Sequence, residues 1–77
     1  MMVGVDCVFN LDGTISVRRI KEKGEWTPVE QGRQWVDGEG RHVLIMIGGL
    51  PAREIWLRSD TLTWELRPAQ SQRKIWV

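Results

Sequence analysis

Three side chains in this sequence could carry chemistry: a single cysteine, a single histidine and an aspartate inside a glycine turn. Cys7 lies in an apolar segment that runs into residues 10–14 (NLDGT), and His42 precedes the apolar run 43–47. A carboxylate after a strand can attack phosphorus, a thiolate paired with an imidazole can attack a carbonyl, and all three side chains can bind metals. Each of these reactions needs further residues at a defined spacing, and the sequence shows whether they are present.

Residues 8–16 (VFNLDGTIS) resemble the nucleophile loop of the haloacid dehalogenase phosphatases. That motif has two aspartates around one variable residue, the first a nucleophile and the second a general acid and base. Asn10 occupies the first position and only Asp12 remains, and an amide cannot form the phosphoaspartate. The resemblance also implies a doubly wound α/β domain, which 77 residues without a helical period cannot build. We interpret the segment as a turn.

The cysteine and the histidine give no stronger indication of catalysis. Cys7 has no basic neighbour in the sequence, which is typical of a small core residue rather than a reactive thiolate. His42 and Cys7 together fall short of a metal-ligand set, so we expect no metal and no cofactor. An enzyme would need His42 within reach of a carboxylate, or Cys7 in a cleft. The sequence therefore predicts a protein that is not an enzyme.

Length, charge and cysteine count limit which kind of domain this chain can form and which partners it can attract. The 77 residues allow one small domain, and 11 basic against 10 acidic residues predict no strong attraction to nucleic acid or to acidic membranes. One cysteine cannot form an internal disulfide. The first nine residues lack the pattern of a signal peptide, and no stretch has the length of a membrane span. We expect a cytoplasmic protein with no membrane partner.

Alternating apolar residues and frequent turn signals predict an all-β fold, a small antiparallel meander of five to seven strands. Gly13 in the left-handed region of a turn would pair Phe9 with Ile15 and Cys7 with Val17, all facing the core. A two-residue loop at Asp60-Thr61 would pair Leu57 with Trp64. The same signals predict an edge strand at 26–30 because of Pro28, a turn at 31–33, a short strand at 34–36, a turn at 37–40, and a strand at 41–48.

We expect residues 1–67 to form a single β domain and residues 68–77 to be a polar linker with an apolar end that could add a last strand. An open sheet of this size is poorly protected. We therefore expect it to curl into a barrel of SH3-like or OB-like size, or to pair as a sandwich.

The run 43–47 (VLIMI) is apolar at every position, although a sheet with one wet face should alternate. Val43, Ile45 and Ile47 match the inward set. Leu44 and Met46 then point the other way with His42, and Trp56 and Val36 are expected beside them, whereas Trp35 and Trp64 are expected in the core.

Three explanations for this second apolar face remain open: cover by the tail Ile75-Trp76-Val77, a second copy of the chain, or a ligand or peptide. We favour a non-catalytic module that acts through protein association, and self-association as a dimer in particular. The predicted partner-binding residues are Leu44, Met46, Trp56, His42, Arg58 and Trp76.

The alternative is a barrel that binds single-stranded nucleic acid through basic and aromatic side chains. Its candidate residues are Arg18, Arg19, Lys21, Lys23 and Trp26. Glu22 and Glu25 interrupt this cluster, so a solvated hairpin is the simpler interpretation.

Overall fold

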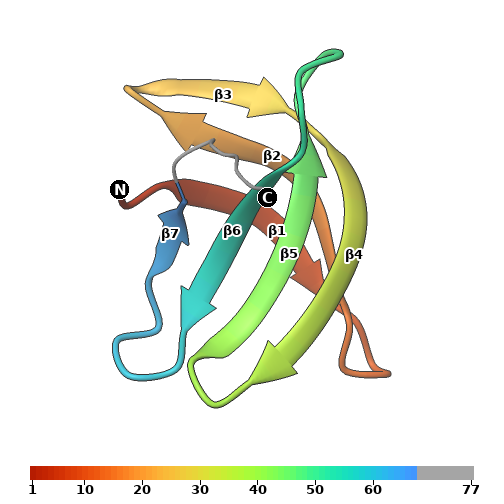
Figure 1. Cartoon of the computed structure of the whole chain (residues 1–77), viewed down its shortest axis with the longest axis vertical. Helices are drawn as coiled ribbons and strands as arrows, with labels where there is room; N and C mark the ends of the chain where they lie inside the picture. The colour runs from red at the N-terminus through yellow and green to blue at the C-terminus, as the bar shows by residue number, and fades with distance from the viewer. Residues whose placement is uncertain (68–77) are drawn as a thin grey trace, which may run out of the picture.

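The computed structural model describes residues 1–67, which form seven strands and no helix (Figure 1). A three-stranded antiparallel sheet has the order β1-β2-β3, and a four-stranded antiparallel sheet has the order β4-β5-β6-β7. The strands are β1 (Gly4–Phe9), β2 (Ile15–Glu22), β3 (Glu25–Pro28), β4 (Glu30–Asp37), β5 (Gly40–Met46), β6 (Arg53–Arg58) and β7 (Trp64–Leu66). The predicted all-β antiparallel fold is confirmed. Among these residues there is no helix of the length and hydropathy that a membrane crossing requires.

The β1–β2 hairpin has the predicted register, with Phe9 opposite Ile15 and Cys7 opposite Val17. Gly13 has a φ of 90°, the left-handed conformation that glycine adopts without steric cost, so the turn interpretation of residues 10–14 holds. Next to Val17, β2 carries an extra residue, because Asp6 faces Arg19 and the register shifts by one. This bulge turns both Val17 and Ile20 toward the core, which strict alternation would not allow.

The prediction that Phe9 lies in the core is wrong. Its side chain is 62% exposed, whereas its partner Ile15 is 1% exposed. Phe9 is the last residue of β1, at the end of the sheet beside the turn, and the neighbouring Leu11 is fully exposed there. The register was correct, but the core ends before it reaches Phe9.

Residues 31–33 do not form the predicted turn. They belong to β4, which runs unbroken from Glu30 to Asp37 beside β5. The pairing shifts by one residue between Gln31 and Gln34, so Gly32 and the residue after it form an irregularity within the strand. The short predicted strand at 34–36 is the second half of a longer one. The edge strand with Pro28 is confirmed as β3, an outer strand of its sheet, but it spans Glu25–Pro28 and not 26–30, because Glu30 begins β4.

The β6–β7 hairpin also has its predicted register, with Leu57 opposite Trp64. Its loop is longer than predicted: the Arg58 N–H donates to the Thr63 carbonyl, and residues 59–62 lie between them. At the β4–β5 turn, Gly40 has a φ of 142° and packs against the β6 backbone so closely that a Cβ would lie 2.0 Å from the Leu57 carbonyl oxygen. This contact fixes the turn of one hairpin against the end of the next.

The core lies between the two sheets. Its buried residues are Ile15, Val17, Ile20, Val43, Ile45, Ile55 and Leu66, and Cys7 and Trp64 pack against them. The sheets also meet at two edges. On one side the Leu66 N–H donates to the Met1 carbonyl, and Met2 forms a bridge with Glu65, so that the N-terminal segment runs beside β7 (Figure 1).

At the opposite edge, side chains of β4 bond to the backbone of β2. The amides of Gln31 and Gln34 accept from the N–H groups of Val17 and Ile15 at 2.8 and 2.9 Å. Both amides also donate to the Ile15 carbonyl. The backbone of β2 is therefore satisfied at Ile15 and Val17, where none of the described strands other than β1 pairs with it.

Candidate functional site

The side of the four-stranded sheet that faces away from the core carries most of the chemically distinctive residues. His42, Leu44 and Met46 alternate with the buried Val43 and Ile45 along β5 and therefore point outward. His42 is flanked by its cross-strand partners, Trp35 on β4 and Trp56 on β6. We call these five outward residues, His42, Leu44, Met46, Trp35 and Trp56, the outer face.

His42 is held between two indole rings. Its ring centroid lies 5.1 Å from that of Trp35 and 5.9 Å from that of Trp56, with interplanar angles of 6° and 2°. The three rings therefore form one parallel stack across three strands. Only 3% of His42 is exposed, so the indoles replace water on both sides of the imidazole.

Each imidazole nitrogen of His42 contacts a carboxylate oxygen. Nδ1 lies 2.5 Å from Glu54 Oε2, and Nε2 lies 2.9 Å from Asp37 Oδ1. An ionised carboxylate only accepts hydrogen bonds, so both nitrogens must donate, and only the imidazolium has two N–H groups. The geometry therefore requires a cation, and a cation between two indole faces is stabilised by their electron-rich rings.

The pKa values of His42 and Asp37 agree with this assignment. Burial lowers the pKa of His42, but the hydrogen bonds and charges of Asp37 and Glu54 outweigh it and raise that pKa above 6.5. The hydrogen bond from His42, followed by the Glu39 N–H, lowers the pKa of Asp37 below its usual value. The contacts of Asp37 and Glu54 thus favour the protonated form of His42 in the folded chain.

Arginines extend the stack at both ends. The guanidinium carbon of Arg33 lies 5.0 Å from the ring centroid of Trp35. Those of Arg58 and Arg67 lie 5.2 and 4.5 Å from the ring centroid of Trp56. Arg67 also donates to Glu54 at 3.0 Å. These cation–π contacts and the ion pair with Glu54 hold the indoles in place.

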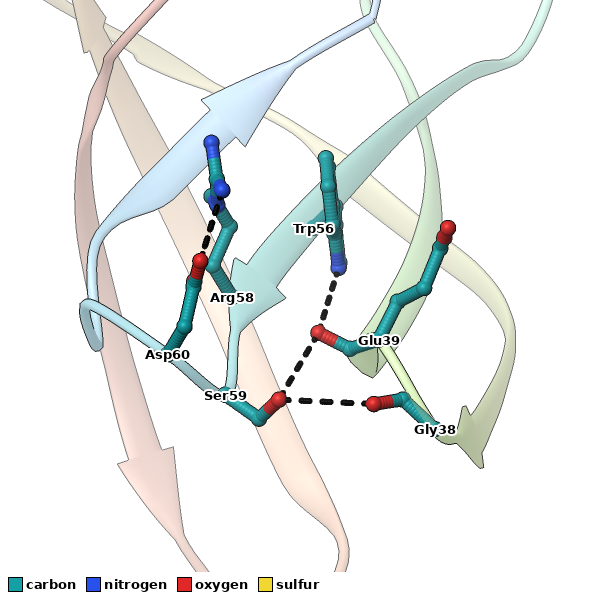
Figure 2. Close-up of a pocket in the computed structure, with 6 residues that line it drawn as sticks. All are labelled: Gly38, Glu39, Trp56, Arg58, Ser59 and Asp60. Atoms are coloured by element: carbon teal, nitrogen blue, oxygen red, sulfur yellow. Dashed lines mark hydrogen bonds and ion pairs between the residues drawn. The ribbon is translucent and has the colours of Figure 1, made fainter.

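A shallow pocket of about 230 Å³ lies beside Trp56, where the β4–β5 turn meets the β6–β7 loop (Figure 2). The Trp56 indole N–H and the Ser59 hydroxyl both donate to the Glu39 carbonyl, at 3.1 and 3.2 Å. Arg58 is paired with Asp60 at 2.7 Å. Most polar groups that line the pocket thus bond to one another, so it offers few open contacts to a small ligand.

Five of the six predicted partner-binding residues come together in the structure. His42, Leu44, Met46 and Trp56 belong to the outer face, and Arg58 continues along β6 beside them. Leu44, Met46 and Trp56 are each partly exposed. Trp76 lies outside the described residues.

Two sequence-based placements around this face are wrong. Trp35 was expected in the core but stacks on His42, and Val36 was expected beside Leu44 but lies opposite Arg41 and is 61% exposed. A two-residue turn at Gly38-Glu39 sets this register, because it places Trp35, not Val36, in line with His42. Applying the turn rule to residues 37–40 would have identified Trp35.

The candidate nucleic-acid cluster is only partly assembled. Lys21 lies opposite Trp26, and the Lys21 and Arg19 cations lie 5.7 and 5.0 Å from the Trp26 ring centroid. Arg19 is also paired with Asp6 at 2.9 Å. The two other candidates do not pair with Trp26: Arg18 occupies the bulge of β2, and Lys23 lies in the tight turn after β2.

The remaining chemical candidates are accounted for by local contacts. Burial, followed by the charge of Asp6, raises the pKa of the Cys7 thiol, which favours the unreactive form. Asp12 accepts hydrogen bonds from the Thr14 N–H and hydroxyl at 3.0 and 2.7 Å, as a turn residue does. His42 lies within reach of two carboxylates, but both of its nitrogens are hydrogen-bonded to them. Cys7 packs against the core on the other sheet.

Asp37, Glu39 and His42 have oxygen and nitrogen atoms within 4.8 Å of one another, a spacing that a metal ion could bridge. His42 and Asp37 bond to each other, however, and Glu39 is paired with Arg67. We interpret the group as a hydrogen-bonded cluster rather than a metal site.

No family model matches the sequence, and no significantly similar curated protein or solved structure is found.

Proposed function

We propose that this protein is a non-catalytic β module that acts through protein association, with the outer face as its contact surface and a second copy of the chain as its partner. The observation that carries the proposal is the stack of Trp35, His42 and Trp56 next to the partly exposed Leu44 and Met46. Ordered aromatic and aliphatic side chains lose little conformational freedom on binding, which favours their use in interfaces.

The charges around the outer face favour a second copy as the partner. In a two-fold symmetric contact each surface meets itself, so it must carry groups that complement one another. Both arginines and carboxylates surround the stack, on the side chains of Arg33, Arg58, Arg67, Asp37, Glu54 and Glu65. A surface of one sign would repel its own copy, whereas this one can pair cations with anions.

The size of the face predicts weak association. The seven residues of β5 span about 23 Å, and the three strands β4, β5 and β6 cover a width of about 14 Å, which gives a flat area of about 300 Å². A standard stable interface covers roughly 800 Å² per partner. A dimer through this face alone should therefore form only at micromolar concentration or above.

Light scattering and sedimentation over a concentration series up to the high micromolar range test the proposal. Leu44→Glu places a charge in the centre of the face and should shift the protein to monomer. Val8→Glu is the matched control, because Val8 is a 46% exposed apolar residue on β1 in the other sheet. A wild-type protein that stays monomeric at high micromolar concentration, unchanged by Leu44→Glu, would rule out the dimer.

The proposal that the module is non-catalytic rests on His42. A general base needs a nitrogen with an available lone pair, and both nitrogens of His42 are already hydrogen-bonded to carboxylate oxygens. The cation is also covered by indoles on both sides.

We further propose that the two sheets are halves of one curled barrel rather than a sandwich. At one edge the contacts of Met1 and Met2 with β7 support it, and at the other the bonds of Gln31 and Gln34 to β2 do. Slow amide exchange at both edges would support a barrel, whereas fast exchange at both would favour separate sheets. The cytoplasmic location stays a prediction from the sequence.

A second candidate function is binding of single-stranded nucleic acid on the outer side of the three-stranded sheet. It is favoured by Trp26, which is 43% exposed and flanked by the cations of Arg19 and Lys21. Titration with a single-stranded oligonucleotide at low salt should quench tryptophan fluorescence, and salt should reverse it. Trp26→Phe should reduce the quenching, and its complete absence in the wild type would reject this function.

A further inference from the structure

His42 occupies a position where a single proton decides whether the surrounding contacts are satisfied. It is the only histidine of the chain, it is 3% exposed, and it joins β4, β5 and β6 through two ring contacts and two hydrogen bonds. Both hydrogen bonds require the imidazolium.

We propose that the proton on His42 locks the outer face: with it, Trp35 and Trp56 are held in one stack, and without it, the stack opens. Since the outer face is the proposed association surface, the same proton also sets the strength of self-association. This second step rests on the proposed function, whereas the lock itself concerns the folded chain alone.

The two carboxylates keep other partners when the proton leaves. Asp37 also accepts from the Glu39 N–H at 2.9 Å, and Glu54 also accepts from Arg67 at 3.0 Å. Each carboxylate therefore keeps a hydrogen-bond donor that holds it in place. A neutral imidazole then directs one lone pair at a carboxylate oxygen, and the ring must turn or leave its position.

The other charges near the stack do not replace that proton. The charged groups that face it are Asp37 and Arg33 from β4, Glu54 and Arg58 from β6, Glu65 from β7, Arg67 after β7, and Glu39 in the β4–β5 turn. Arg58 is paired with Asp60 and Glu65, and Arg67 with Glu54 and Glu39. Asp37, by contrast, bonds to the cation of His42 itself.

Nuclear magnetic resonance across a pH series provides the test, because the only imidazole in the chain can be assigned without ambiguity. The nitrogen chemical shifts of His42 should titrate with a midpoint above 6.5, the pKa of an unperturbed histidine. The indole N–H of Trp56, bonded to the Glu39 carbonyl, should shift with the same midpoint. Sedimentation of the same samples should show the dimer weakening about tenfold through that transition.

Variants separate the lock from a general pH effect. Asp37→Asn and Glu54→Gln should each lower the His42 midpoint, and Asp12→Asn, in the distant β1–β2 hairpin, should leave it unchanged. His42→Gln should abolish the pH response of the Trp56 indole.

Three outcomes are distinguishable. A shared midpoint of imidazole, indole and dimer supports both the lock and the proposed association. A shared midpoint of imidazole and indole in a protein that is monomeric at every pH supports the lock and overturns the association. A midpoint at or below 6.5, or an indole that does not follow the imidazole, overturns the lock.

Discussion

Gln31 on β4 accepts a hydrogen bond from the backbone N–H of Val17 on β2, with 2.8 Å between nitrogen and Oε1. The same amide donates to the Ile15 carbonyl at 2.8 Å, so the side chain offers one donor and one acceptor, as the peptide group of a neighbouring strand would. The Gln31 side chain thus satisfies an N–H and a carbonyl of β2, in place of the backbone of a neighbouring strand.

Replacing this amide should expose an unsatisfied N–H at the edge of the core. We predict that Gln31→Ala lowers the free energy of unfolding by about 1–3 kcal/mol, because the Val17 N–H loses its partner. Urea unfolding measures the loss, and amide exchange at Val17 should accelerate. Glu30→Ala, at the exposed neighbouring position, is the control. Unchanged exchange at Val17 would contradict the assignment.

Gly40 should be the least replaceable glycine of the β4–β5 turn. An alanine there would place Cβ 2.0 Å from the Leu57 carbonyl oxygen at a φ of 142°. Gly40→Ala should therefore cost at least about 3 kcal/mol. Gly38→Ala, two residues away with nothing within 4 Å of its Cβ, should cost about 0.5 kcal/mol or less. Equal unfolding midpoints for the two variants would show that the close approach is absent in solution.

Phe9 and Ile15, which pair across the β1–β2 hairpin, should contribute unequally to the free energy of unfolding. Ile15 is 1% exposed, so Ile15→Ala should cost about 2–5 kcal/mol. Phe9 is 62% exposed, so Phe9→Ala should cost about 1 kcal/mol or less. Chemical denaturation of both variants checks the order, and a larger loss for Phe9→Ala would restore Phe9 to the core.

Stability should depend on the pH through His42. The raised pKa of His42 means that the folded state binds its proton more tightly than the unfolded chain. This stabilisation is complete below 6.5 and is lost as pH rises through the folded-state pKa. At the acid end, the lowered pKa of Asp37 implies a further loss as pH falls through its folded-state value. Urea unfolding at several pH values should show the free energy of unfolding falling toward both acid and alkaline pH. His42→Gln should remove the fall on the alkaline side.

Asp12 should matter for the turn and not for catalysis. Asp12→Ala removes its two hydrogen bonds with Thr14 and should lower the thermal midpoint modestly. Leu11→Ala, at the fully exposed tip of the same turn, should leave the midpoint nearly unchanged. Loss of a measurable phosphatase activity in Asp12→Ala would refute the interpretation of this loop as a turn.

The sequence predicts those parts of the fold that local rules determine. Turn residues and alternation together define the pairs Phe9–Ile15 and Leu57–Trp64, and both are observed. The placement of Trp56 on the same face as His42 follows from the same alternation, and the structure shows that the two residues also pair directly. These features involve neighbouring strands joined by short loops, where spacing alone determines the register.

Features that depend on distant contacts could not be predicted in this way. The bulge beside Val17 and the irregularity after Gln31 change which residues face the core, and neither has a strong local signal. Glu54 and Asp37 meet His42 only because β4 and β6 both flank β5. The charged character of His42 therefore emerges from the sheet order and not from the residues beside it in the chain.

The glutamine pair on β4 has a consequence for aggregation. A strand edge with unsatisfied backbone groups is a template on which another chain can add and begin a fibril. Gln31 and Gln34 fill that template at Ile15 and Val17 with amides that cannot propagate a ladder. These two amides thus cap backbone groups of β2 that would otherwise be open to pairing with another chain.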